Sequence, residues 1–116
     1  MTTGMEQAAC RLAVYGTLAP GKPNAHELAA LTGTWTPGTV RGRLVEQGWG
    51  AAMGFPAIVL DDAESTVTVH LFKSPDLPAH WSRLDAFEGD GYHRVPVRVS
   101  TAAGEAWASI YVSVDG

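Results

Sequence analysis

Apolar and polar residues alternate along three stretches of the chain, at residues 65–72, 92–101 and 106–114. Such alternation is typical of β-strands that bury one face and expose the other. Shorter apolar runs bounded by turn residues are also expected to be strands. The predicted strands are 12–15, 35–45, 57–60, 65–72, 92–101 and 106–114. His93 shares the apolar face of its strand, which predicts a hydrogen-bonded core histidine.

Two short helices are predicted between these strands. The first spans residues 25–31, with Asn24 as its N-cap and Glu27 completing a capping box. The second begins at Ser74-Pro75 and ends at Gly89, a residue type favoured after the last helical turn. Its apolar stripe recurs at helical spacing and consists of Leu77, Trp81 and Leu84.

The order of these elements and two interior glycines point to the fold class. Gly38 and Gly42 interrupt the strand 35–45, and they indicate a bulge, a barrel bend or the close approach of another segment. The predicted order is β-α-β-β-β-α-β-β, in which strands dominate. The sequence therefore predicts an α+β fold whose sheet is curved or closed into a barrel.

The composition predicts one folded domain and argues against two classes of partner. With 116 residues, 46% hydrophobic and 17% charged, the chain is expected to form one domain with its own core. The net charge of −4 and the scattered arginines argue against a nucleic-acid partner. Apolar runs fall short of the roughly 18 residues of a membrane helix, so no membrane partner is expected. Cys10 stands alone, which indicates a reducing compartment and a cytoplasmic location.

The first residues carry neither the basic start nor the apolar stretch of a secretory signal peptide. Residues 1–10 are expected to be a disordered leader, and residues 11–116 are expected to be the folded domain. The strand at 12–15 would then be the first element of that domain.

The turn after this first strand has two open interpretations. Residues 16–22 match the first seven positions of a phosphate-binding P-loop, G-x-x-x-x-G-K. The eighth position is Pro23 instead of the Ser or Thr that binds magnesium, and proline has no N–H for a phosphate. Nucleotide binding is therefore not expected. Either the N–H groups of the turn bind another anion, such as a carboxylate, or the turn is an ordinary Gly-Thr turn.

Glu88 is the acidic residue whose position suggests a role as an acid or base. It ends the second predicted helix, where the negative end of the helix dipole disfavours a carboxylate, and it follows Phe87. Desolvation there would raise its pKa above the usual value of about 4.3 and make it an acid or base near neutral pH. The alternative is an ordinary surface glutamate before a glycine. Asp85 and Asp90 are expected to be solvated.

The histidines show no spacing that is typical of metal ligands, and no cysteine pair accompanies them. A metal site is therefore not expected. The chain also lacks the G-x-S-x-G sequence of a serine nucleophile elbow. The histidines are His26, His70, His80 and His93.

Two motifs follow each other along the chain. The first is Y-G-[ST]-L, present in Val14–Leu18, with Gly21 and Asn24 after it. The second is L-D-x-[FY]-E-G…Y-x-R, present in Leu84–Gly89 and Tyr92–Arg94. Together, in this order and in a chain of this size, they resemble the γ-glutamylcyclotransferase-like family of AIG2-like and YtfP-like small proteins, over residues 12–112.

The resemblance implies a fold and a site. The fold would be a small mixed β-barrel with flanking short helices and a cavity at one end. Glu88 would be the catalytic acid/base, and neither a metal nor an organic cofactor would be needed. The backbone of the turn after Tyr15 would hold the α-carboxylate of a γ-glutamyl group. The substrate-binding residues that the resemblance implies are Tyr15, Gly16, Thr17, Leu18, Tyr92 and Tyr111.

The implied activity is that of a cyclising transferase or lyase. It converts a small-molecule γ-glutamyl amine or peptide to 5-oxoproline and releases the amine. Two alternatives stay open: a non-catalytic protein of the same fold that binds an amino-acid-like molecule, and an enzyme that removes a γ-glutamyl cap from a biosynthetic intermediate. The group attached to the γ-glutamyl moiety and the oligomeric state are also left open.

One stretch departs from the family pattern. Members commonly carry G-E-[VL]-[YF] on the strand before the second helix, whereas this chain has Val69-His70-Leu71-Phe72. If that strand lines the cavity, the protein is expected to differ from the better-known members in the shape of the substrate that it accepts or in its activity.

Overall fold

The computed structural model describes residues 4–15, 26–45, 57–61, 63, 65–89 and 91–113. Every predicted strand is present, with its ends displaced by no more than two residues. The first predicted helix is confirmed in part, because its described portion is four residues long. The elements are α1 (Gly4–Ala9), β1 (Arg11–Val14), α2 (His26–Ala29), β2 (Thr34–Val45), β3 (Ala57–Leu60), β4 (Thr66–Lys73), α4 (Leu77–Glu88), β5 (Tyr92–Thr101) and β6 (Gly104–Ser113).

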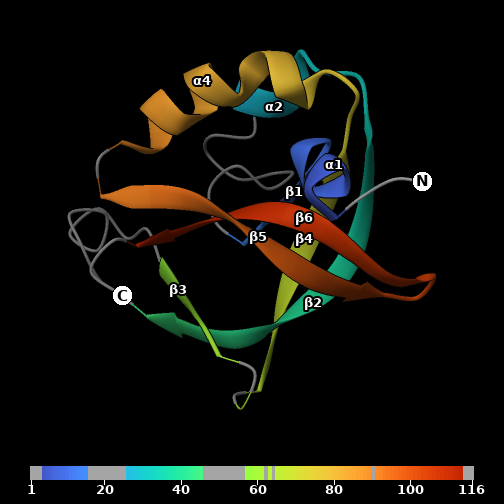
Figure 1. Ribbon diagram of the computed structural model, residues 1–116, viewed down its shortest axis with the longest axis vertical. Helices are drawn as coiled ribbons and strands as arrows, with labels where there is room; N and C mark the ends of the chain where they lie inside the picture. Colours follow the sequence, from blue (N-terminus) through green and yellow to red (C-terminus); the bar gives the residue numbers. More distant parts are fainter. Residues whose placement is uncertain are drawn as a thin grey trace.

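Five of these strands close into a mixed barrel. The strand order is β3-β2-β4-β1-β6-β5, and the ring closes where β2 also pairs with β5, at Thr39 and Ser100. The pairing of β1 with β6 is parallel, whereas the other pairings are antiparallel. Figure 1 shows α2 and α4 together on one side of the curved sheet. The predicted small mixed barrel with flanking short helices is therefore confirmed.

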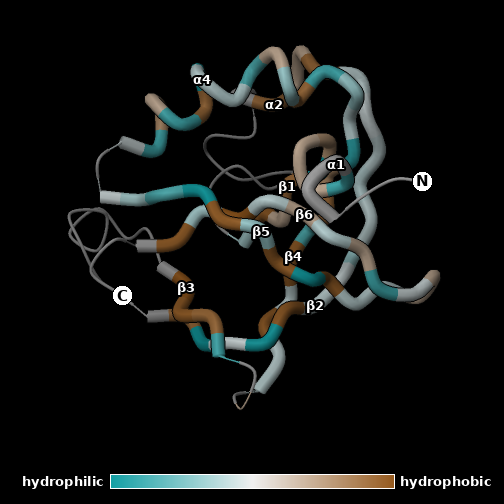
Figure 2. The backbone as a smooth tube through the Cα atoms, viewed as in Figure 1, coloured by the Kyte–Doolittle hydropathy of each residue, from teal (hydrophilic) through white to brown (hydrophobic). Residues whose placement is uncertain are grey.

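The strands bury apolar residues on both faces of the sheet. Along the tube of Figure 2, these apolar positions alternate with polar ones. Leu12 and Val14 face α4, whereas Ala13 between them faces the barrel interior, so β1 is apolar on both faces from Leu12 to Val14. The helix-side core consists of Leu12, Val14, Leu28, Leu31, Phe72, Leu77, Trp81, Leu84 and Tyr111. The barrel core consists of Ala13, Val40, Ile58, Val69, Leu71, Val97, Val99, Ala108 and Ile110.

The glycines of β2 lie where another strand comes close. A Cβ atom on Gly38 would lie 2.7 Å from Cγ1 of Val99. A Cβ atom on Gly42 would overlap the carbonyl oxygen of Val59. Gly42 is also the residue at which β2 stops pairing with β4 and begins to pair with β3. Of the three possibilities for these glycines, close approach of a neighbouring strand is the one that the structure shows.

The apolar stripe of α4 is buried as predicted, with Leu77, Trp81 and Leu84 in the helix-side core. The predicted start of this helix is wrong by two residues, because Asp76 is the N-cap. The Ser74 hydroxyl donates a hydrogen bond to the carbonyl oxygen of Thr32 (2.5 Å) and accepts one from the Asp76 N–H (3.1 Å). Ser74 therefore ties the turn before α4 to the segment before β2.

The prediction of a disordered leader over residues 1–10 is wrong for residues 4–9, which form α1. The carbonyl oxygen of Ala8 accepts a hydrogen bond from the Ser109 hydroxyl (2.8 Å), and that of Ala9 accepts one from Trp81 Nε1 (2.9 Å). Ala8 is itself buried. These partners are 101 and 72 residues away along the chain, so the local sequence carries no sign of them.

The prediction of a core histidine at position 93 is also wrong, because the His93 side chain is exposed. His93 is the second residue of β5, and its face of the strand becomes buried only from Val97 onward. Strand alternation gives the face of the residue but not how far along the strand the core extends.

Candidate functional site

The last turn of α4 positions Glu88 at the edge of the barrel. Glu88 is the final residue of the helix, and Gly89 follows with φ 83° and ψ −178°. This backbone conformation is open almost only to glycine, because a Cβ atom makes it sterically unfavourable. The N–H of Gly89 donates the last helical hydrogen bond, to the carbonyl oxygen of Asp85 (3.1 Å). The carbonyl oxygen of Gly89 then accepts from the N–H of Tyr92 (3.2 Å), so the chain turns there into β5.

The carboxyl group of Glu88 is largely removed from solvent. Burial raises its pKa from the ordinary value of 4.5 to about 7, because the charged form loses hydration. A carboxyl group with such a pKa is present in both its acid and base forms near neutral pH. The prediction from the position of Glu88 is therefore supported by the structure, and the alternative of an ordinary surface glutamate is not.

Three tyrosines lie within electrostatic range of this carboxyl group. The negative charge of Glu88 contributes to the raised pKa of Tyr15, Tyr92 and Tyr111, with burial as the largest cause for each hydroxyl. All three hydroxyl groups therefore stay protonated at neutral pH. The Tyr15 hydroxyl donates to the carbonyl oxygen of Tyr111 (2.6 Å), which fixes the end of β1 against β6.

The three tyrosines approach Glu88 from different parts of the fold. Tyr15 directly follows β1 and packs against the barrel core, whereas Tyr92 and Tyr111 belong to the helix-side core. The site thus lies where the two cores meet, at the C-terminal end of α4. The structure brings Glu88 together with the described tyrosines among its predicted partners.

The turn predicted to bind a carboxylate lies outside the described residues. This applies to Gly16, Thr17 and Leu18. Tyr15 directly precedes that turn and lies close enough to Glu88 for the two groups to interact electrostatically.

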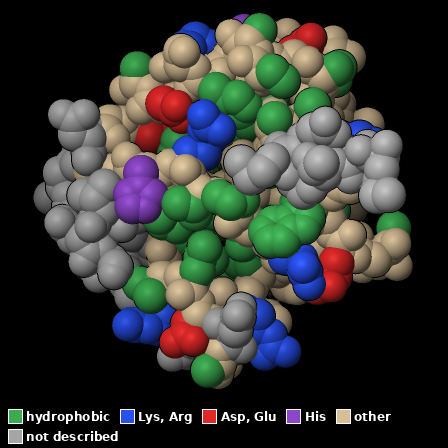
Figure 3. Space-filling view, viewed as in Figure 1, with side chains coloured by type: hydrophobic (Ala, Val, Ile, Leu, Met, Phe, Trp, Pro, Cys, Tyr) green, Lys and Arg blue, Asp and Glu red, His purple; other side chains and the backbone are tan. Residues whose placement is uncertain are grey.

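Asp85 has a role that the sequence does not reveal. It is predicted to be solvated, and 45% of its side chain is exposed, but it accepts hydrogen bonds from two long-range partners. The Tyr111 hydroxyl donates to Oδ1 (2.7 Å), while Arg94 donates through Nε to Oδ1 (3.0 Å) and through Nη2 to Oδ2 (3.3 Å). Figure 3 shows acidic and basic side chains in contact between α4 and the barrel on this face.

These partners hold the carboxyl group of Asp85 in its charged form. Burial of the group raises its pKa, but the hydrogen bonds from Arg94 and Tyr111 outweigh that effect, and the resulting pKa lies below the ordinary value. The signal in the sequence is the second motif, which contains both Asp85 and Arg94. Their pairing follows only once α4 and β5 are known to pack against each other.

A comparison with known protein families assigns the chain to one of them. Residues 12–115 match the family described as gamma-glutamyl cyclotransferase, AIG2-like. The chain belongs to this family. No curated protein sequence matched it.

Solved structures agree with this assignment to the AIG2-like family. YkqA from Bacillus subtilis is 31% identical with a TM-score of 0.71, over 90% of this chain and 36% of that protein. The chain thus spans about a third of the length of YkqA. An uncharacterized protein from Pyrococcus horikoshii is 25% identical with a TM-score of 0.61, over 89% of this chain and 76% of the other. An AIG2-like protein from Mus musculus shares the fold, with 20% identity and a TM-score of 0.71 over 94% of this chain and 80% of the other.

The stretch that departs from the AIG2-like pattern lies on β4. Val69 is fully buried in the barrel core, opposite Gly38 of β2. His70 is exposed on the outer face, with its ring 6.5 Å from that of Trp35 in an edge-on contact. Valine at this position therefore fills the barrel interior next to a residue without a side chain.

In the described part of the chain, His, Cys, Asp and Glu side chains do not gather in any group of three or more that could hold a metal ion. None of its helices has the length and apolar character needed to cross a membrane.

Proposed function

We propose that this protein is a γ-glutamylcyclotransferase that converts a γ-glutamyl amine or peptide to 5-oxoproline and releases the amine. The observation that carries the proposal is Glu88, a partly buried carboxyl group whose pKa is raised to about 7 and whose charge acts on three tyrosines. Membership of the AIG2-like family supports the reaction class.

In the proposed reaction, the α-amine of the substrate attacks its own γ-carbonyl carbon. A new C–N bond closes the five-membered ring, and the bond from the γ-carbon to the leaving nitrogen breaks. The α-ammonium loses one proton to solvent to become the attacking amine. Glu88 takes the second proton from the α-nitrogen as the ring forms and delivers it to the leaving nitrogen. A pKa near 7 suits both steps, because the group can accept and release a proton without a large free-energy cost.

The surroundings of Glu88 suggest how the substrate would be held. The Tyr15 and Tyr111 hydroxyls donate their protons within the protein, to a carbonyl oxygen and to Asp85, so a substrate would not receive those protons. We assign the α-carboxylate of the substrate to the backbone of Gly16, Thr17 and Leu18, because this turn follows Tyr15. Folding the glutamyl chain between the turn and Glu88 would supply proximity and orientation.

The test is to incubate the protein with a panel of γ-glutamyl compounds and to measure 5-oxoproline by mass spectrometry. The panel contains glutathione, several γ-glutamyl-amino acids and γ-glutamyl-lysine. We expect 5-oxoproline from at least one of them, and none from the Glu88→Gln protein. Glu105→Gln is the matched control, because Glu105 is an exposed residue paired with Arg98 at the far end of the β5–β6 hairpin.

The two alternatives give different results in the same experiment. A binding protein would show a thermal shift with glutamate or 5-oxoproline and no turnover of any compound. An enzyme that removes a γ-glutamyl cap from a biosynthetic intermediate would leave small peptides intact and act only on larger γ-glutamyl amines. Full activity in the Glu88→Gln protein would overturn the assignment of Glu88.

A further inference from the structure

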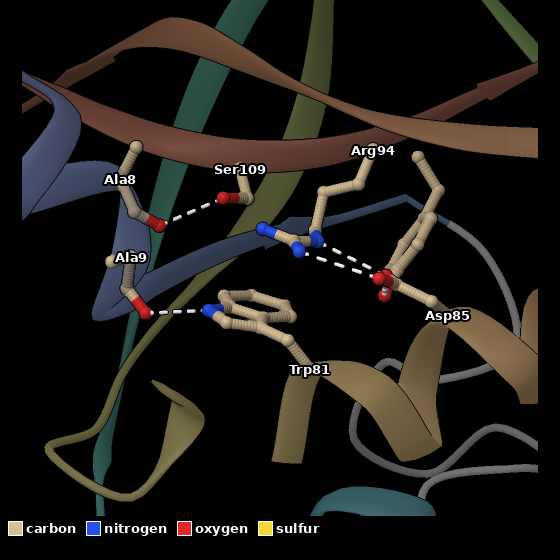
Figure 4. A network of polar contacts seen from close by, with 7 residues as sticks. Ala8, Ala9, Trp81, Asp85, Arg94 and Ser109 are labelled. Atoms are coloured by element: carbon tan, nitrogen blue, oxygen red, sulfur yellow. Dashed lines mark hydrogen bonds and ion pairs between the residues drawn. The ribbon is translucent and has the colours of Figure 1, made fainter. Parts of the chain in front are cut away.

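Asp85 connects α4 to the two strands that carry tyrosines of the site. Figure 4 shows the Asp85 carboxylate and the Arg94 guanidinium pointing toward each other between α4 and β5. On its other side, Asp85 accepts the hydrogen bond of the Tyr111 hydroxyl from β6. Glu88 lies one helical turn further along, so the turn that carries Glu88 is docked on the barrel through Asp85.

Arg94 is held on a second side by Trp81. Its guanidinium carbon lies 4.2 Å from the centroid of the Trp81 ring, a favourable stacking of a cation on an aromatic face. The Trp81 indole is itself fixed by its hydrogen bond to the carbonyl oxygen of Ala9. The guanidinium is therefore confined between Asp85 and Trp81, on the part of α4 that precedes Glu88.

The network also reaches the first motif of the chain. Tyr111 donates its hydroxyl to Asp85 and accepts, at its backbone carbonyl, the hydroxyl of Tyr15. Asp85 is thus linked through one residue of β6 to the residue before the Gly16 turn. A displacement of Asp85 would therefore displace both Glu88 and Tyr15.

We propose that Asp85 is a positioning residue for Glu88. It fixes the last turn of α4 against β5 and β6, so that the Glu88 carboxyl group stays in its sheltered position. The inference concerns the same site as the proposed function and rests on it for its effect on turnover. Its effect on the ionisation of Glu88 does not depend on any substrate.

The ionisation of Glu88 reports on this docking. Among the described residues, the titratable groups whose pKa Glu88 affects are Tyr15 after β1, Tyr92 on β5 and Tyr111 on β6. Burial is the cause of the raised pKa of Glu88, and neither Asp85 nor Arg94 contributes to it. Releasing the last turn of α4 lets water reach the carboxyl group, which favours its charged form.

The experiment follows the ionisation of the Glu88 side-chain carboxyl group by ¹³C NMR in the substrate-free protein. The resonance is assigned by its loss in the Glu88→Gln protein. We expect the pKa of Glu88 to fall toward its ordinary value in Asp85→Asn, which weakens both contacts of Asp85, and to fall by less in Arg94→Gln, which removes one of them. Equal pKa values in the wild type and both variants would overturn the inference.

The Tyr111→Phe protein removes the other contact of Asp85 and keeps its pair with Arg94. We expect it to lower the pKa of Glu88 by less than Asp85→Asn does. The NMR titration also distinguishes this inference from the proposed function. If no γ-glutamyl compound is turned over but the pKa values shift as stated, the proposed reaction fails and the role of Asp85 stands. A pH-rate profile that does not change in Asp85→Asn would contradict the positioning role in an active enzyme.

Discussion

Asp85 and Glu88 are two carboxyl groups three residues apart on one helix, and their environments shift their pKa values in opposite directions. Asp85 is the more exposed, but hydrogen bonds from Arg94 and Tyr111 stabilise its charged form. Glu88 is more buried, and burial favours its neutral form. Position on the helix therefore does not decide the ionisation of a carboxyl group; its partners and its burial do.

The difference assigns two roles within one turn of α4. A carboxylate that stays charged and paired suits a structural contact, whereas a carboxyl group that changes protonation near neutral pH suits proton transfer. Substitutions at Glu88, Gly89 and Asp85 test this division, in order from the largest expected effect to the smallest.

Replacing Glu88 with glutamine is expected to have the largest effect. The amide keeps the shape of the side chain but cannot take up a proton, so turnover should fall by at least about a hundredfold. The measurement is the initial rate of 5-oxoproline formation with the best compound of the panel. A rate within threefold of wild type, with Glu105→Gln unchanged, would remove Glu88 from the reaction.

The same substitution is expected to stabilise the protein at high pH. Because the folded pKa of Glu88 is raised, the stability that its protonated form contributes is complete below pH 4.5 and is lost as the pH rises through about 7. Above pH 7 the wild type should be less stable by up to about 3 kcal/mol than it is at low pH. Urea unfolding of both proteins at pH 5 and pH 8 measures this, and an advantage of Glu88→Gln that does not grow with pH would contradict the burial of Glu88.

Substitution of Gly89 by alanine loosens the turn that carries Glu88 while leaving the contacts of Asp85 in place. The backbone of Gly89 has φ 83° and ψ −178°, and no atom lies within 4 Å of the site of a Cβ atom. The cost is then conformational, about 2 kcal/mol in unfolding free energy. Chemical denaturation measures it, and a loss below about 0.5 kcal/mol would show that this conformation is not required.

Substitution of Asp85 by asparagine is expected to cost about 1 kcal/mol at neutral pH, because the pair with Arg94 is partly exposed and screened by solvent. The lowered pKa of Asp85 gives stability that is present above its unfolded pKa and is lost as the pH falls through its folded pKa. The difference between the two proteins should therefore shrink in acid. A difference that stays constant from pH 7 to pH 2 would mean that the charge of Asp85 is not involved.

Strand and helix positions can be predicted from the sequence because alternation and helical spacing are local properties. The stripe of α4 and the strand at residues 92–101 are examples. The helix α1 cannot be predicted in this way, because its stabilising partners are Ser109 and Trp81. The exposure of His93 depends on where the barrel core ends, which is likewise a property of the whole fold.

For the site, the predicted end of the helix and the glycine after it make Glu88 a candidate from the sequence, beside the alternative of a surface glutamate. The family motifs contain Tyr15 and Tyr92, and the resemblance implies Tyr111. In the structure, the charge of Glu88 affects the pKa of all three hydroxyls. The link from Asp85 to Arg94 and Tyr111 is not predicted by the sequence. It joins segments that are 9 and 26 residues apart, and only the packing of α4 on β5 and β6 brings them together.

The pH dependence of kcat/KM for 5-oxoproline formation tests the central claim most directly. If Glu88 is the general base, the rate should rise with pH and level off with an apparent pKa near 7, in agreement with the NMR titration of the free protein. The Glu88→Gln protein should lack this rise. A rise centred near 4.5, or a profile that is the same in both proteins, would contradict the assignment of Glu88 as the base.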